Sequence, residues 1–151
     1  MIPEDPATVS ALIELLELAG RSMHSIGYAD GLYPAQWTAL RYFSKASDGS
    51  RTASALARFQ GFANGPVSRT VRTLISKGLL RKATSQPAGR AEHLEITDNA
   101  RTLLDHDPAR TIADSIAKLS DEEKAALDHA LRAVIRSASG VWPRDGKANG
   151  K

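Results

Sequence analysis

The residues with the clearest chemistry are the arginines and lysines between Arg51 and Arg90. This segment holds eight bases and no Asp or Glu, so it carries a net charge of +8, while the rest of the 151-residue chain sums to −5. Arg69 and Arg72 are three residues apart, which places them on one face of a helix. Guanidinium groups bind DNA phosphates and guanine edges. The segment is therefore a candidate surface for a polyanion; a solvated basic face without a partner is the alternative.

Other kinds of site lack the residues that they require. The chain has no cysteine, which excludes disulfides, thiolate metal sites and cysteine nucleophiles. Its four histidines show no metal-ligand spacing, and the acids Glu122 and Glu123 fit the capping box of a helix that begins after Ser120. We find no phosphate-binding loop and no nucleophile elbow. We therefore expect no enzyme activity, metal or cofactor, and no feature supports the hypothesis of a small hydrolase or metal enzyme.

The basic segment has the pattern of a short helix, a turn and a second helix. Thr52 can cap the first helix, and Gly61 fits the turn. The second, a recognition helix of about residues 64–77, has Pro66 in its first turn and Gly78 as its natural stop. Four apolar residues form its predicted inward stripe: Val67, Val71, Leu74 and Ile75. The opposite face is polar and basic.

A hairpin is predicted directly after the second helix. Two runs rich in apolar residues flank the turn-forming residues 84–89, which indicates a two-stranded wing of about residues 79–97 with Arg90 beside its tip. Helix, turn, helix and hairpin make a winged helix-turn-helix, which places the second helix in a major groove and Arg90 near a minor groove. The candidate DNA-binding residues are Arg51, Asn64, Gly65, Ser68, Arg69, Arg72, Thr73, Arg81, Lys82 and Arg90.

The fold class is therefore mainly α with a small β-hairpin wing (α+β). We place the winged helix-turn-helix at residues 32–104, an N-terminal dimerisation helix within residues 1–31, C-terminal dimerisation helices at 105–138, and a flexible tail at 139–151. The N-terminal helix is apolar on more than one face, as expected of a helix shared between a core and a partner subunit; an internal core helix has the same pattern. The chain lacks a secretory signal and any stretch of roughly 18 apolar residues, so we expect a cytoplasmic protein without membrane contact.

The segment from Ala53 to Leu104 resembles the multiple-antibiotic-resistance regulator (MarR) family. The similarity extends over five short segments. Residues 32–40 look like the family's helix before the DNA-binding unit, and residues 53–57 look like the first helix of its helix-turn-helix. Residues 67–71, 75–81 and 94–97 look like the centre of its recognition helix, the end of that helix before the wing, and the returning strand of the wing. The resemblance implies a DNA-binding transcription regulator, a repressor, that binds a pseudo-palindromic operator as a homodimer formed by its terminal helices. It also places Ser68 and Arg69 at recognition-helix contact positions and Arg90 at that of the wing arginine.

The chain departs from the family pattern at three places, of which the last is Ala100 in place of a common Gly. The family's wing tip usually reads Asp-Arg-Arg, whereas this chain has Ala88-Gly89-Arg90 and so lacks the acid that steadies the tip. Gly65 and Pro66 replace the usual Ser and Thr, and Ala63 stands where a capping Ser is common. A winged-helix protein-interaction module without sequence-specific DNA binding therefore stays open as the alternative function.

A small-molecule effector pocket is a further interpretation. Five residues between the terminal helices and the DNA-binding unit are its candidates: Met23, Tyr28, Tyr33, Trp37 and Phe62. Aromatic residues at helical spacing are more often ordinary core, so both interpretations stay open. Neither the operator nor an effector follows from the sequence.

Overall fold

The computed structural model of the chain describes residues 7–61 and 63–139. Its elements run in the order α1 (Val9–Ile26), α2 (Pro34–Lys45), a 3-10 turn η1 (Asp48–Ser50), α3 (Ala53–Gln60), α4 (Asn64–Ser76), β1 (Leu80–Lys82), β2 (Leu94–Ile96), α5 (Asp98–Leu104), α6 (Arg110–Ala117) and α7 (Asp121–Ser139). The strands form one antiparallel hairpin in which Arg81 faces Glu95. This architecture confirms the predicted mainly α fold with a small β-hairpin wing. Most of the predicted tail and Phe62 lie outside the described residues.

The core belongs to the winged-helix unit. Its largest fully buried side chains come from α2, α3, α4 and both strands: Trp37, Leu40, Phe43, Leu56, Leu74, Leu80 and Leu94. The three on α2 are spaced by three residues and therefore share one helix face. That face packs against α4, β2 and α5, so α2 is the element around which the unit is assembled.

Local signals in the sequence set the helix boundaries around the site. The Thr52 hydroxyl accepts a hydrogen bond from the Ala55 amide at 3.1 Å and so caps α3. Gly61 ends α3 and Gly78 follows α4, with φ angles of +67° and +70° that glycine adopts without the steric cost of a side chain. Glycines at these two positions therefore determine both the turn before α4 and the end of α4.

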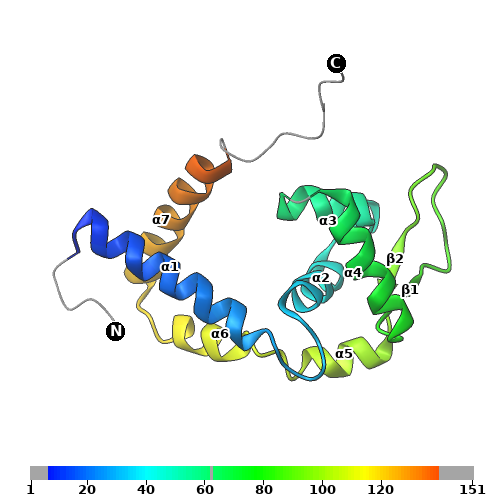
Figure 1. Ribbon diagram of the computed structural model, residues 1–151, viewed down its shortest axis with the longest axis horizontal. Coiled ribbons are helices and arrows are strands. Elements are labelled where there is room, and N and C mark those ends of the chain that lie inside the picture. The colour runs from blue at the N-terminus through cyan, green and yellow to red at the C-terminus, as the bar shows by residue number, and fades with distance from the viewer. Residues whose placement is uncertain (1–6, 62, 140–151) are drawn as a thin grey trace, which may run out of the picture.

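The terminal helices lie apart from this core. Figure 1 shows α1, α6 and α7 on one side of the molecule and the winged-helix elements on the other, with α5 between them. Several apolar side chains on α1 and α7 are exposed, among them Ile13 at 53%, Leu131 at 38% and Val134 at 43%. Within the described residues, no helix is both long and apolar enough to cross a membrane.

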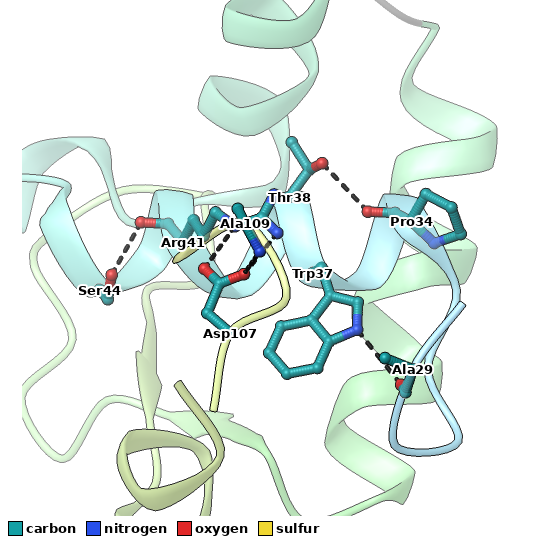
Figure 2. Close-up of polar contacts among 8 residues, drawn as sticks. All are labelled: Ala29, Pro34, Trp37, Thr38, Arg41, Ser44, Asp107 and Ala109. Carbon is teal, nitrogen blue, oxygen red and sulfur yellow. Dashed lines mark hydrogen bonds and ion pairs between the residues drawn. The ribbon is translucent and has the colours of Figure 1, made fainter. Parts of the chain in front are cut away.

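An ion pair joins the two parts of the molecule (Figure 2). The Arg41 guanidinium on α2 donates two hydrogen bonds, of 2.6 and 2.7 Å, to the carboxylate of Asp107 in the α5–α6 connection. The same carboxylate accepts the Ala109 amide at 2.8 Å. Partial burial alone would raise the pKa of Asp107, but these hydrogen bonds and the Arg41 charge hold that pKa below its usual value. The start of the C-terminal helices is thereby attached to the core helix α2.

Replacing Asp107 by asparagine is expected to lower the free energy of unfolding by about 1–3 kcal/mol at neutral pH, because charge-assisted hydrogen bonds are lost. A carboxyl group with a lowered pKa contributes its full stability above the unfolded pKa of about 3.9 and loses it as the pH falls through the folded value. The difference between wild type and Asp107→Asn in urea unfolding should therefore shrink in acid. Asp98→Asn is the control, because the side chain of Asp98 is 98% exposed. A difference that does not change with pH would contradict this account.

Candidate nucleic-acid interface

The helix α4 presents its N-terminal turn to solvent. Asn64, Gly65 and Pro66 are exposed, and nothing crowds the position that a side chain would take at Gly65. The N-cap residue Ala63 offers no side-chain hydrogen bond to the first helical amides. Such uncapped amides, at the positive end of the helix dipole, favour a phosphate. The absence of a cap, which the sequence indicated, leaves these donors available.

The outer face of α4 carries two arginines without an acidic partner. Arg69 and Arg72 are exposed, and no carboxylate among the described residues pairs with either. Ser68 is half-buried beside them, and the Thr73 hydroxyl donates to the Arg69 carbonyl at 3.0 Å. Val67, Val71 and Leu74 face the core as expected. Ile75 does not: it is 36% exposed, which corrects the predicted inward stripe. The face therefore offers guanidinium groups on a rigid helix.

Three other predicted DNA-binding bases are paired within the protein. The Arg81 guanidinium lies 2.7 Å from the Glu95 carboxylate, and the Lys82 ammonium lies 2.9 Å from that of Glu92. Arg51 contacts the Asp48 carboxylate at 2.9 Å and donates to the Ala46 carbonyl at 3.0 Å. The acids that follow the basic segment in sequence thus fold back on it. Among the described bases of this segment, five have no acidic partner: Arg69 and Arg72 on α4, Arg90, Arg58 on α3, and Lys77, whose ammonium donates to the Gly31 carbonyl.

Arg90 lies in the loop of the wing. The strands are shorter than predicted, so Arg90 precedes β2 by several residues and is exposed, again without an acidic partner among the described residues. Together with Ser68 and Arg72 of α4 it lines a groove of about 320 Å³ between helix and wing. Glu92 lies on the same groove. The groove therefore brings together three of the ten predicted DNA-binding residues, Ser68, Arg72 and Arg90, while Arg69 lies on the same helix without lining it.

The four predicted effector residues that the structure describes do not form one cluster. Met23 lies in a hollow between α1 and α2 that Thr38 and Arg41 also line. Trp37 borders the same hollow but is fully buried, so it supports the wall from behind; its indole N–H donates to the Ala29 carbonyl at 3.3 Å (Figure 2). Tyr28 and Tyr33 are exposed and pack edge to face on each other. Sequence reasoning missed Arg41, although a cation one helical turn beyond Trp37 was a usable signal.

Comparison with known proteins assigns the unit that carries these side chains. A sequence model of the MarR family matches residues 30–91, which include α2, α3, α4 and the first strand of the wing. This winged-helix unit belongs to the MarR family. No curated protein matches the chain significantly.

Solved structures with the same fold extend over most of the chain. The Staphylococcus aureus MepR–DNA complex has a TM-score of 0.67 and 17% identity, covering 87% of this chain and 96% of that chain. A mutant of Escherichia coli MarR has a TM-score of 0.61 and 16% identity, covering 87% and 99%. The Mycobacterium tuberculosis MarR-family protein Rv2887, solved with salicylic acid, has a TM-score of 0.58 and 19% identity, covering 87% and 99%. The described helices and hairpin therefore have the winged-helix fold of MarR-type proteins throughout.

Proposed function

We propose that this MarR-family chain is a transcription repressor that binds a pseudo-palindromic site in double-stranded DNA as a homodimer. Each α4 enters a major groove, and Arg90 of each wing reaches the adjacent minor groove. The cytoplasm is the expected location of such a regulator.

The charge distribution on the MarR-family unit carries the proposal. Arg69, Arg72 and Arg90 extend from two neighbouring elements and have no acidic partner among the described residues, whereas Arg81 and Lys82 are paired across the hairpin. A guanidinium that is exposed and unpaired forms charge-assisted bonds with phosphates or guanine at little cost. The MepR structure, which contains DNA, supports the same use of this fold here.

The homodimer is supported by the terminal helices. The apolar side chains exposed on α1 include Val9, Leu12 and Ile13, while α7 exposes Leu131 and Val134. Neither helix needs these residues for the core of the winged-helix unit. Exposed apolar faces on two helices outside the core are typical of a subunit interface. A two-fold dimer built on them carries two α4 helices, as a pseudo-palindromic site requires.

Replacing Arg69 or Arg90 by alanine is expected to weaken binding to a selected duplex by about 1–3 kcal/mol each, because each removes a base or phosphate contact. Fluorescence anisotropy over a series of salt concentrations measures both affinity and its salt dependence. Affinity should fall steeply with salt through counterion release, and loss of a phosphate contact should reduce that slope by about one.

Arg101→Ala is the matched control for this measurement. Arg101 is also an exposed arginine, but it pairs with Asp98 on α5, outside helix α4 and the wing. Its removal should leave affinity nearly unchanged. Undiminished binding by both Arg69→Ala and Arg90→Ala would overturn the assignment. No duplex affinity at low salt would favour the protein-interaction module instead.

Effector control is a second part of the proposal. The hollow between α1 and α2 is lined by Met23 and by the Arg41 side chain, which also holds Asp107 and with it the start of the C-terminal helices. A small ligand in this hollow binds where the winged-helix unit meets the C-terminal helices. Its binding therefore changes the spacing of the two α4 helices in the dimer. The Rv2887 structure, which contains salicylic acid, supports a small-molecule effector. A shift in operator affinity on adding a candidate ligand, absent in Met23→Trp, tests this.

A further inference from the structure

The loop of the wing has little backbone support. Beyond Lys82 and Leu94, the last pair of the hairpin, the Ala83 amide still donates to the His93 carbonyl at 2.9 Å. Residues 84–92 then form no strand pairs, and Arg90 lies among them. An irregular loop of this length samples many conformations, and ordering it on DNA costs free energy. Something other than the strands must hold Arg90 in place if it contributes to binding.

The side chain of Gln86 closes the base of this loop. Its amide nitrogen donates to the carbonyls of Ala83 and His93, both at 2.9 Å, and its amide oxygen accepts the His93 amide, also at 2.9 Å. One side chain thus bridges the end of one strand to the start of the other. This needs a donor and an acceptor on one head group, which glutamine provides and an acid or a base does not.

One further contact attaches this bridge to the body of the protein, and an ion pair within the hairpin lies on the other side of Arg90. The His93 ring nitrogen Nδ1 lies 2.9 Å from the Asp48 carbonyl of η1. Because a carbonyl only accepts, Nδ1 carries the proton and donates. On the other side of Arg90, the Glu92 carboxylate pairs with Lys82 at 2.9 Å. Arg90 therefore lies between two residues that contact the hairpin, Gln86 four residues before it and Glu92 two residues after it; the Glu92 pair is exposed, so Gln86 is the stronger of the two restraints.

We propose that Gln86 is a positioning residue for DNA binding: its three hydrogen bonds pre-order the wing loop and so place Arg90 for contact with DNA. This rests on the proposed function. It also accounts for the wing tip, Ala88-Gly89-Arg90, which lacks an acid to steady it. The order comes instead from an amide at the base of the loop.

The test is a double-mutant cycle between Gln86→Met and Arg90→Ala in the full-length protein. Methionine has a similar length and no charge but cannot replace the amide's hydrogen bonds. With Arg90 present, Gln86→Met should weaken binding to a selected duplex about three- to tenfold, the cost of ordering the loop. In the Arg90→Ala background it should cost less than about twofold, because the residue that it positions is gone. Ser85→Ala, in the same loop and without a described hydrogen bond, is the matched control.

Hydrogen exchange of the His93 amide in the free protein gives a readout that does not depend on DNA. Exchange should be faster in Gln86→Met and unchanged in Ser85→Ala. Equal losses of affinity in both backgrounds, or faster exchange with no loss of affinity, would overturn the positioning role while leaving the proposed function intact. Failure of the wild-type protein to bind any duplex would overturn both.

Discussion

Substituting Leu131 by aspartate is expected to convert the protein from a dimer to a monomer and to weaken operator binding by about two to four orders of magnitude. Leu131 lies among the exposed apolar side chains of α7. In a two-fold interface each substitution occurs twice, so two carboxylates enter one apolar contact without partners. A monomer then loses the effective concentration by which one bound half-site recruits the second. Light scattering gives the mass, and anisotropy on the same sample gives the affinity.

His129→Asp is the control for this substitution. His129 is two residues before Leu131, which places it on nearly the opposite side of the helix at about 100° per residue. The His129→Asp substitution adds an acid to the same helix, but on its polar face, and should leave the dimer intact. Circular dichroism checks that Leu131→Asp retains its helices. A dimer of unchanged stability in Leu131→Asp would exclude α7 from the interface.

Replacing Trp37 by alanine is expected to lower the free energy of unfolding by about 3–5 kcal/mol, a large part of the stability of a small domain. Trp37 is 0% exposed and is the largest side chain on the α2 face that packs against α4, β2 and α5. The substitution leaves a cavity and removes the indole hydrogen bond to the Ala29 carbonyl, which keeps its bond from the Leu32 amide. Urea unfolding followed by circular dichroism, at fixed protein concentration, measures the loss.

Phe59→Ala is the matched test of burial. Phe59 is also aromatic and lies on a neighbouring helix, but it is 68% exposed and contacts the Tyr42 ring at the surface. Its removal should cost less than about 1 kcal/mol. Similar losses for the two variants would show that α2 is not the centre of the core.

The recognition helix could be placed from the sequence because its ends have local causes. Pro66 is tolerated only near a helix start, and Gly78 adopts the positive φ that follows a helix end, so the predicted range of 64–77 and the observed Asn64–Ser76 nearly coincide. Thr52 caps its helix as its position suggested, and Thr97 caps α5 in the same way. These signals act within a few residues and need no knowledge of the fold.

Whether each basic side chain pairs with an acid could not be predicted in the same way. The basic segment ends at Arg90, so counting charges along the chain missed that Glu95, opposite Arg81, and Glu92, in the loop before β2, pair with Arg81 and Lys82. Pairing across a hairpin depends on its register, which a single residue of slip changes. Ile75 was misplaced for a related reason, because helical periodicity alone does not fix how wide the buried face is.

The role of the terminal helices depends on a partner rather than on local pattern. In the sequence, the apolar pattern of α1 fits a core helix and an interface helix equally well. The structure separates these interpretations within one chain, since Ala11 is buried whereas Val9, Leu12 and Ile13 are exposed. Their dimerisation remains a proposal that the Leu131→Asp experiment addresses.

The most direct test of the central claim is selection of bound duplexes from a random library at moderate salt, with the stoichiometry measured by light scattering on the same complex. Recovery of an inverted repeat bound by two chains, with half-sites about one helical turn apart, is the predicted result. Weak binding without sequence preference, or an asymmetric site bound by one chain, would contradict the account of a dimeric, sequence-specific regulator.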